Sequence, residues 1–475
     1  MNKKKVHIRF GTSGWRAIIA EDFTFDNVRI VTQAIADFVR KQNISPKLIV
    51  GFDTRFLSIE FARSCANILA ANKIKVLLTN RDTPTPVLAY HIVRKKLSGA
   101  INFTASHNPP EYNGIKFSPS YGGPAPEEVT DVIEKRIKIL QANPKLVKAE
   151  TRDAGLIKIF DPRSQYLNKI KKIVDMGKIK RARLKIAVDC MYGTSRGYID
   201  VLLGSAARKF WVLNDRLNPL FGGLPPEPDR EYITSLIQLV KRNRLDLGLA
   251  CDGDADRFGI VDRGGVFLNP NEIVTLLFYY LLKTRGKVKR KVARTTATTH
   301  MIDAIAEKEG VEVVETPVGF KHIGRVLSEG DCLIGGEESG GLSIFGHVPE
   351  KDGILACMLI AEMVANWKKP LVSILNSLYK KYGYFYSDRL NFHLSSVKKK
   401  KLISRLKQIC KKNKLAGLEI KDTNINDGFK FNFARNFWIM FRASGTESIV
   451  RCYMEAENKS KLNYLKKIAQ RIATA

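Results

Sequence analysis

The sequence predicts a multidomain α/β protein with three α/β units followed by a smaller α+β unit. At 475 residues the chain is several times the usual domain size, so several domains are expected. Over most of its length, short apolar runs of strand length alternate with segments whose apolar residues have helical spacing. From about Tyr384 the strand candidates become longer and more polar, and a lysine-rich helix appears among them. The change in pattern separates the last unit from the first three.

The alternating segments give the expected elements in order. Strands are expected at residues 47–53, 75–78, 100–103, 184–189, 247–251, 438–442 and 450–455, and near Val292 and Val311. Helical spacing covers residues 58–72, and a proline-started helix is expected near Thr85. Such alternation favours helices packed on largely parallel sheets. The apolar run at 273–282 is about half the length that spans a bilayer, so it is interpreted as a buried helix.

The composition points to a cytoplasmic protein. Apolar residues make up 44% of the chain and charged residues 27%, which is enough apolar material for several buried cores. The basic N-terminal segment lacks the apolar run that a signal peptide needs. The seven cysteines are scattered without a CxxC pair, so neither a disulfide framework nor a zinc site is predicted. We expect no membrane association and a monomer or a homodimer.

The formal net charge of +32 attracts anions, which include nucleic acids and sugar phosphates. Much of the charge lies in basic runs at residues 287–294, 398–401 and 407–414. A nucleic-acid groove would interleave aromatic residues with the basic ones, and these runs contain none. We therefore interpret the runs as a solvated surface and expect no specific nucleic-acid partner.

A first chemical loop, TASHNPPEYNGIK, follows the strand candidate that ends at Phe103. The Asn-Pro-Pro that follows Ser106 prevents the continuation of helix or sheet. His107 and Lys116 supply a proton acceptor and a cation close in the sequence. A serine hydroxyl needs such neighbours to act as a nucleophile. The alternative is a structural turn in which Ser106 caps the local backbone.

A second loop, DGDADR, follows the strand candidate at 247–251. Its aspartates at alternate positions, Asp252, Asp254 and Asp256, can converge on one hard cation. An EF-hand is excluded because its glycine and glutamate positions are occupied by Arg257 and Arg263. With only three protein ligands, coordination positions stay open for a phosphate oxygen, as in catalytic magnesium sites. The alternative is a loop that merely exposes three acids.

Two further loops carry groups suited to sugars and phosphates. GGEESGG at residues 335–341 places Glu337, Glu338 and Ser339 between glycines, where hydroxyl-rich ligands could be bound. RASGTE at residues 442–447 offers a guanidinium, hydroxyls and free backbone N–H groups, which suit a phosphate.

Together with FGTSGWR at residues 10–16, these four loops, in this order, resemble the α-D-phosphohexomutase superfamily. The resemblance spans nearly the whole chain and implies three related α/β domains with mixed sheets and a smaller C-terminal α+β domain around a central cleft. We expect one loop in each domain, with boundaries at residues 1–155, 156–265, 266–375 and 376–475.

The resemblance also implies roles for individual residues. Ser106 would be phosphorylated, and its phosphoserine oxygen would complete a Mg²⁺ site made by Asp252, Asp254 and Asp256. Arg16, His107, Lys116 and Arg257 would line the reaction centre. The sugar phosphate would be held by Lys321, Glu337, Ser339, Arg442, Ser444, Gly445 and Thr446.

The implied reaction interconverts hexose 1-phosphate and hexose 6-phosphate through a hexose 1,6-bisphosphate, which also serves as activator. TPVGFK at residues 316–321 is similar to the glucose-type relatives, so glucose is expected first and mannose second. Gly340-Gly341, where some relatives carry a histidine, and Ser448, where proline is usual, leave the substrate open. A phosphoglucosamine mutase is therefore an alternative.

Two rival functions belong to other classes. A phosphatase or kinase-like enzyme would use Asp252 or Asp254 as its nucleophile and would not need a phosphorylated Ser106. A non-catalytic, basic nucleic-acid-binding relative would fit the charge, but all four chemical loops keep their key residues.

Overall fold

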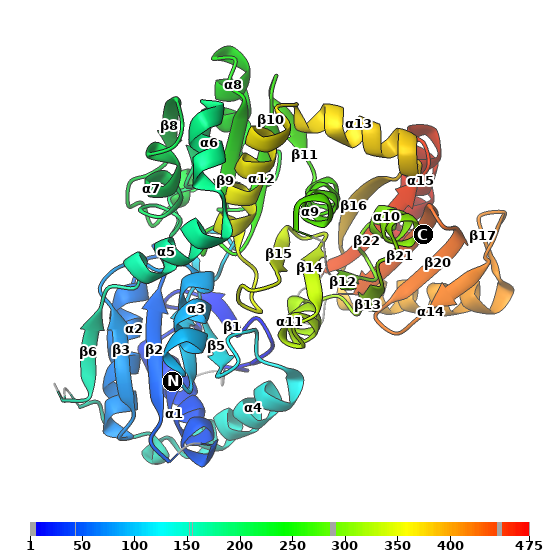
Figure 1. The fold of residues 1–475 in the computed structure, drawn as a ribbon. Helices are drawn as coiled ribbons and strands as arrows, with labels where there is room; N and C mark the ends of the chain where they lie inside the picture. Colours follow the sequence, from blue (N-terminus) through cyan, green and yellow to red (C-terminus); the bar gives the residue numbers. More distant parts are fainter. Residues whose placement is uncertain are drawn as a thin grey trace.

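The computed structural model describes residues 6–42, 44–151, 153, 155–285, 291–443 and 449–474. It contains the three α/β units and the smaller α+β unit that the sequence predicts (Figure 1). In Figure 1 the first unit is blue and lies at the lower left, and the second is green and lies above it. The third, in yellow-green, lies in the centre, and the fourth, in orange and red, lies at the right.

The first unit is a six-stranded mixed sheet covered by helices on both faces. Its elements are β1 (Trp15–Ile18), α1 (Phe25–Gln42), β2 (Lys47–Phe52), α2 (Ser58–Ala71), β3 (Lys75–Thr79), α3 (Thr85–Lys95), β4 (Gly99–Phe103), β5 (Tyr112–Pro119), α4 (Glu127–Ala142) and β6 (Ile157–Phe160). The strand order is β1-β5-β4-β2-β3-β6, with β5 antiparallel to both of its neighbours. Helices α1, α2 and α4 pack on one face, and α3 packs on the other. The expected boundary at 155 falls before β6, which pairs with β3 and so belongs to this sheet.

The second unit is a five-stranded mixed sheet. Its elements are α5 (Arg163–Ile173), α6 (Met176–Ala182), β7 (Lys185–Asp189), α7 (Ile199–Gly204), β8 (Lys209–Leu213), α8 (Thr234–Arg242), β9 (Leu247–Cys251), β10 (Phe258–Asp262) and β11 (Val266–Leu268). The strand order is β11-β10-β9-β7-β8. β7 runs parallel to β8 and β9, whereas β9 and β10 are antiparallel. Residues 252–257 are therefore the connection of a hairpin.

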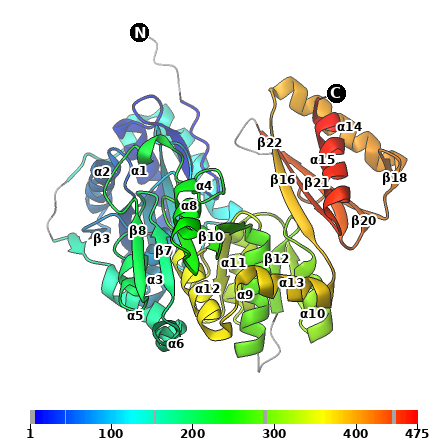
Figure 2. The same cartoon turned by 90° about the horizontal axis from the view of Figure 1, so that it is seen from above.

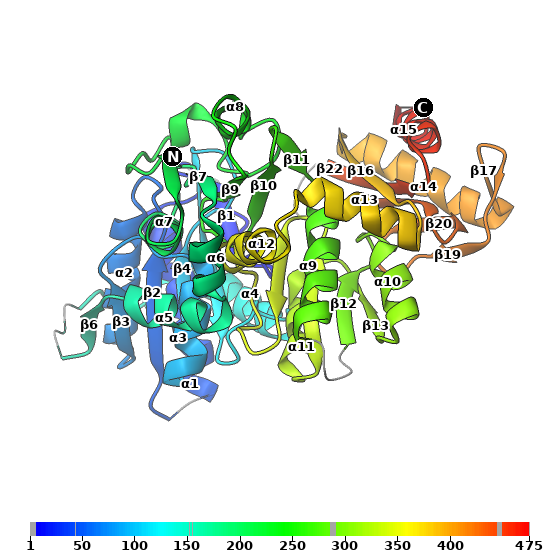
Figure 3. The same cartoon turned by 45° about the horizontal axis from the view of Figure 1, so that its top comes forward.

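The third unit is a four-stranded mixed sheet with the order β13-β12-β14-β15. Its elements are α9 (Pro270–Arg285), β12 (Lys291–Thr295), α10 (Met301–Glu309), β13 (Val313–Thr316), α11 (Phe320–Ser328), β14 (Cys332–Glu337), β15 (Gly341–Ile344), α12 (Gly353–Trp367) and α13 (Leu371–Tyr382). Helix α12 is mostly apolar and is buried over residues 353–365 because it contacts α6 of the second unit and α9 of the third (Figure 3). The expected buried helix at 273–282 lies inside α9.

The fourth unit is an antiparallel sheet with two long helices. Its elements are β16 (Tyr386–His393), α14 (Ser396–Lys412), β17 (Lys414–Leu415), β18 (Leu418–Glu419), β19 (Asp422–Asn424), β20 (Phe429–Ala434), β21 (Phe437–Ala443), β22 (Ile449–Ala456) and α15 (Lys459–Thr474). The main sheet has the order β16-β22-β21-β20-β19, and β17 pairs only with β18. Figure 2 shows this unit set to one side of the other three.

The buried apolar residues of the described chain form a core shared by the second and third units, a separate core in the first unit and another in the fourth. The shared core takes Val87 and Tyr90 from α3, much of the second and third units, and α13. The core of the fourth unit draws on no other unit within the described residues. A small cluster of Ala297, Trp438, Met440 and Tyr453 joins the third unit to the fourth. Among the described helices, none is both long enough and apolar enough to cross a membrane.

Candidate active site

Ser106 lies in the turn that follows β4, with its hydroxyl directed at the second unit. Its Oγ donates a hydrogen bond to Asp252 Oδ2 at 2.8 Å, and its backbone N–H donates to Thr104 Oγ1 at 2.8 Å. The residue is 1% exposed and has φ 54°, a left-handed conformation that is uncommon for a residue with a Cβ. Such a conformation persists only where the surrounding structure enforces it, so the position of Ser106 is tightly fixed.

Gly253 lets the serine turn and the aspartate loop approach each other. A Cβ on Gly253 would lie 2.6 Å from the carbonyl oxygen of Ser106, closer than real Cβ atoms come to any neighbour. The glycine in DGDADR is therefore needed for the contact between the two loops, which brings the first and second units together at the site.

Arg55 holds the backbone of the serine turn in place, and the sequence reasoning missed this residue. The guanidinium forms an ion pair with Asp53 at 3.1 Å, and neither side chain is exposed. It also donates hydrogen bonds to the carbonyl oxygens of Ser106, Asn108, Pro109 and Tyr112. Its planar fork can serve several acceptors at once, which a lysine could not do. The available signal was Asp-Thr-Arg at residues 53–55, at the end of the expected strand. An isolated basic residue after a strand does not form a recognisable motif.

Arg55→Met is expected to lower the free energy of unfolding by about 3–5 kcal/mol, because it leaves Asp53 buried without its cation. Denaturant unfolding of the purified variant would measure the loss. Arg29→Met is the matched control, since Arg29 pairs with Asp26 and Glu150 at the surface, where its side chain is 38% exposed. The control should lose less than about 1 kcal/mol. Equal losses in the two variants would show that the buried contacts of Arg55 do not stabilise the protein more than a surface ion pair does.

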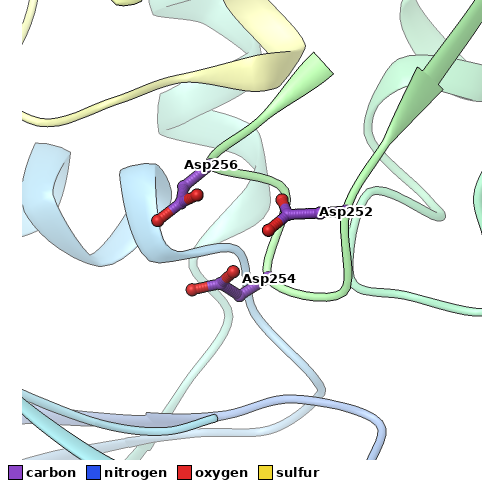
Figure 4. A group of neighbouring side chains, drawn as sticks. All are labelled: Asp252, Asp254 and Asp256. Carbon is purple, nitrogen blue, oxygen red and sulfur yellow. The ribbon is translucent and has the colours of Figure 1, made fainter. Parts of the chain in front are cut away.

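The aspartate loop brings its carboxylates together. Asp252, Asp254 and Asp256 lie in the β9–β10 connection and are at most 1% exposed, and their ligand atoms lie within 4.8 Å of one another. Figure 4 shows the three side chains converging from this loop. Burial, followed by the charges of Asp256 and Asp254, raises the pKa of Asp252 well above its ordinary value. A cation at the centre would remove this electrostatic cost.

The donor set fits a hard divalent cation. Asp254 Oδ1 and Asp256 Oδ1 are buried and accept no hydrogen bond from the described residues, so both are free to bind an ion. Three carboxylates and the nearby Ser106 Oγ supply only oxygen, the donor that Mg²⁺ and Ca²⁺ prefer. Three protein carboxylates do not fill an octahedral shell, which leaves positions for a phosphate oxygen.

Lys116, on β5, links the first unit to this cluster. Its Nζ lies 2.6 Å from Asp254 Oδ2 and 3.5 Å from Asp256 Oδ2. Thr85, at the start of α3, also donates to Asp254 Oδ2 at 2.6 Å. Burial opposes the ionisation of Asp254, but Lys116 and Thr85 keep its pKa below the ordinary value. The carboxylate is therefore charged and available to a metal ion.

The structure gathers Arg16, His107 and Arg257 around the same point. Arg16 Nη1 donates to Asn108 Oδ1 at 2.6 Å, and Arg257 donates its backbone N–H to Asp252 Oδ1 at 2.9 Å. His107 Nδ1 lies 3.4 Å from Ser106 Oγ. Burial, followed by the charges of Arg257 and Arg16, lowers the pKa of His107 well below its ordinary value. The imidazole is therefore neutral at neutral pH and able to accept a proton.

The glutamate loop forms the turn between β14 and β15. Ser339 Oγ donates to Glu337 Oε1 at 2.6 Å, and Glu338 Oε2 accepts a hydrogen bond from Thr295 Oγ1 at 2.9 Å. Burial, followed by the charge of Glu337, raises the pKa of Glu338. Glu337 and Ser339 thus lie together, and both can bond to hydroxyl groups.

Lys351 is a second residue that the sequence reasoning missed. Its Nζ lies 3.0 Å from Asp256 Oδ2, and its side chain runs across Gly341. A Cβ on Gly341 would lie 2.3 Å from Lys351 Cδ, so this glycine makes room for the lysine. Burial works against the ammonium, but Asp256 and Glu337 raise the pKa of Lys351. The available signal was Asp352 before an apolar run, which marks the cap of a helix and hence a fixed loop.

The remaining candidates lie apart from this cluster or outside the described residues. Lys321, in the first turn of α11, pairs with Glu127 of α4 at 2.5 Å. Arg442, at the end of β21, donates to Asp427 Oδ1 at 2.9 Å. No described contact joins either residue to the aspartate cluster, so their roles in substrate binding stay predictions. Ser444, Gly445 and Thr446 lie outside the described residues.

Comparison with known proteins matches each of the four units. The models of phosphoglucomutase/phosphomannomutase α/β/α domains I, II and III match residues 7–143, 164–265 and 269–382, and that of the C-terminal domain matches 395–473. A phosphoglucomutase of Komagataeibacter xylinus is 28% identical over 94% of this chain and 87% of its own. A phosphoglucomutase/phosphomannomutase of Thermococcus kodakarensis is 29% identical over 95% of each chain.

A solved structure shares the whole architecture. A Thermus thermophilus protein assigned as a phosphomannomutase superposes with a TM-score of 0.85 at 32% identity, over 99% of this chain and 100% of its own. The four units, their order and the chemistry of the serine and aspartate loops agree with this likeness. The chain belongs to the phosphoglucomutase/phosphomannomutase family of α-D-phosphohexomutases and is a phosphohexomutase.

Proposed function

We propose that this mutase interconverts hexose 1-phosphate and hexose 6-phosphate through a phosphorylated Ser106, with glucose as the first substrate and mannose as the second. The observation that carries the proposal is the position of Ser106 Oγ, 2.8 Å from Asp252 Oδ2 and 3.4 Å from His107 Nδ1. An acceptor carboxylate, a neutral imidazole and several cations surround one hydroxyl, as an activated nucleophile requires.

In the proposed reaction, the bond from Ser106 Oγ to phosphorus breaks as a sugar hydroxyl forms its own bond to phosphorus. The hydroxyl proton ends on Ser106 Oγ, so the first half leaves a free serine and a hexose 1,6-bisphosphate. The bisphosphate then turns and returns its other phosphoryl group to Ser106. The same bisphosphate, supplied from solution, would phosphorylate a fresh enzyme and so act as activator.

Different side chains of the site are proposed to bind the phosphoryl group, the sugar and the metal ion. Lys116 and Lys351 hold positive charge beside the aspartates, where the phosphoryl oxygens would lie. Glu337 would accept hydrogen bonds from sugar hydroxyls, and Ser339 would donate to them or accept from them. Mg²⁺ bound by Asp252, Asp254, Asp256 and a phosphoserine oxygen would neutralise the charge that develops during transfer. Lys321, Arg442, Ser444, Gly445 and Thr446 are proposed to hold the sugar phosphate.

The mass of the intact purified protein tests the covalent route. Wild-type protein incubated with glucose 1,6-bisphosphate should carry one added phosphoryl group, and Ser106→Ala should carry none. Ser205→Ala, which changes a serine at the end of α7, is the control and should be phosphorylated like the wild type. A phosphoryl group that persists on Ser106→Ala, or that never appears on the wild type, would exclude the phosphoserine mechanism.

The sugar is decided by comparing turnover of glucose, mannose and glucosamine 1-phosphates at equal Mg²⁺. The proposal expects the highest kcat/KM for glucose 1-phosphate and measurable turnover of mannose 1-phosphate. A clear preference for the amino sugar would support the alternative, a phosphoglucosamine mutase, without changing the proposed use of Ser106.

We further propose that the enzyme is cytoplasmic and monomeric or homodimeric, and that its net charge of +32 belongs to a solvated surface.

The basic run at 398–401 lies on α14 of the fourth unit, and all but one of its side chains are exposed. Salt should lower kcat/KM smoothly by screening the attraction of sugar phosphates. An anisotropy titration should find only weak DNA binding at 0.15 M salt. Submicromolar binding there, abolished by neutralising this run, would instead reveal a nucleic-acid site.

A further inference from the structure

The loop between β15 and α12 delivers Lys351 to the active site. Lys351 Nζ lies 3.0 Å from Asp256 Oδ2, and the next residue, Asp352, directly precedes α12. Asp352 Oδ1 accepts a hydrogen bond from the backbone N–H of Leu355 at 2.8 Å, which makes Asp352 the N-cap of that helix. The orientation of Asp352 therefore sets the point from which the Lys351 side chain departs.

Asp352 is in turn held by a helix of another unit. The hydroxyl of Tyr166, on α5 of the second unit, contacts Asp352 Oδ1 at 2.9 Å and Oδ2 at 2.7 Å. His347 Nε2 lies 2.7 Å from the same Oδ2, and neither His347 nor Asp352 exposes its side chain. A buried carboxylate without such donors would be strongly unfavourable, so these contacts fix its position.

The rest of the loop is held equally firmly. Lys169, also on α5, donates to the carbonyl oxygen of Gly346 at 2.7 Å. At the other side, a Cβ on Gly123 or on Gly324 would lie 2.7 Å or 2.5 Å from the carbonyl oxygen of Pro349. The backbone therefore has little room to shift, and next to Asp352 the backbone N–H of Gly353 donates to the carbonyl oxygen of Ala255 at 3.1 Å. Among the described contacts, the hydroxyl of Tyr166 is the side-chain link from the second unit to Asp352.

We propose that Tyr166 is a positioning residue of the mutase, which holds Asp352 so that Lys351 lies between the aspartate cluster and the glutamate loop. The proposal rests on the proposed function. Tyr166 makes no described contact with Ser106 or with the aspartate cluster at 252–256. It acts through Asp352, the residue that follows Lys351. The packing of the second unit against the third thereby becomes part of the catalytic apparatus.

Tyr166→Phe removes only the hydroxyl and has a matched control in the same core. The rings of Tyr166 and Tyr198 lie 5.9 Å apart, and the buried hydroxyl of Tyr198 has no hydrogen-bond partner among the described residues. Tyr166→Phe should lower kcat about 10- to 100-fold with little change in the KM for glucose 1-phosphate, as loss of an outer-sphere partner does. Tyr198→Phe should leave both constants unchanged. Equal kinetics for the two variants would overturn the proposal.

A double-mutant cycle with Lys351→Met separates positioning from general destabilisation. If Tyr166 acts through Lys351, Tyr166→Phe should have almost no further effect on kcat once Lys351 is methionine, although its effect on Tm persists. The same fold-loss of kcat in both backgrounds would show that the role of Tyr166 is only structural.

Calorimetric Mg²⁺ binding provides a measurement that needs no turnover. Because Lys351 repels a cation beside Asp256, Lys351→Met should bind Mg²⁺ more tightly. Tyr166→Phe should tighten binding in part, and the double variant should match Lys351→Met. Unchanged Mg²⁺ affinity in Tyr166→Phe would contradict the proposal. Absence of phosphoserine from the wild type would instead contradict the proposed function alone.

Discussion

Mutase turnover should fall at least about a thousandfold when Ser106 is replaced by alanine, because the covalent route loses its nucleophile. A coupled assay that converts glucose 1-phosphate to glucose 6-phosphate, with glucose 1,6-bisphosphate present, would measure the loss. Ser205→Ala removes a hydroxyl that donates to the carbonyl oxygen of Leu202 and has no described contact with the aspartate loop, so this variant should keep wild-type turnover. Near-normal activity of Ser106→Ala would exclude Ser106 as the nucleophile and leave Asp252 or Asp254 as the alternative.

The left-handed backbone of Ser106 allows chemistry and folding to be separated. Ser106→Gly should be as inactive as Ser106→Ala, since both lack the hydroxyl. It should be at least as stable as the alanine variant, because glycine adopts φ 54° without a steric penalty. A loss of activity in both variants, without a loss of stability in the glycine variant, would assign the defect to chemistry. Recovery of activity with glycine would contradict a role for the hydroxyl.

Asp254→Asn is expected to weaken Mg²⁺ binding and to lower turnover at least about 100-fold. Loss of an outer-sphere partner costs up to about 100-fold, and loss of a direct ligand should cost no less. The amide keeps the shape of the side chain but removes one of the three negative charges, while Lys116 stays 2.6 Å away. The Mg²⁺ dependence of kcat and direct calorimetric binding would both report the change.

Asp262→Asn is the matched control for that change. Asp262 ends the same hairpin, is 1% exposed, and accepts a hydrogen bond from the backbone N–H of Val372 at 2.9 Å. It takes no part in the aspartate cluster, so its variant should keep the wild-type dependence on Mg²⁺. Wild-type Mg²⁺ dependence in Asp254→Asn as well would show that the aspartate loop is not the metal site.

The serine and aspartate loops could be read from the sequence because each holds its chemistry within a few residues. Asp252, Asp254 and Asp256 share one short loop, and their mutual repulsion implies a cation without knowledge of the fold. Arg55 and Lys351 could not be found in this way. Arg55 acts on Ser106, which is 51 residues away, and Lys351 acts on Asp256 in a different unit. Contacts of this kind depend on how the units pack.

The length of a loop predicts the direction of the strands that it joins. The alternating pattern favoured largely parallel sheets, whereas β9 and β10 are antiparallel, as are β4 and β5. A parallel connection needs about a dozen residues or more, and the loop at 252–257 is too short for one. The position of β6 could not be predicted, because the strand has only four residues, two of them exposed, and its sequence does not show that it pairs with β3.

The separate core of the fourth unit has a consequence for how the molecule loses its structure. The second and third units share one apolar core, to which the first unit contributes only residues of α3, so heat or denaturant should disrupt the second and third units as one cooperative block. The fourth unit can open without exposing most of that block, since its apolar links to the third unit are a small cluster around Trp438 and the contacts of Phe385 and Tyr386 with the shared core. Polar contacts add to these links, such as that from Lys430 Nζ to the carbonyl oxygen of Thr296 at 2.6 Å. Calorimetry should therefore resolve the unfolding of the fourth unit as a transition of its own, and substrate bound between the units should bring that transition closer to the unfolding of the rest.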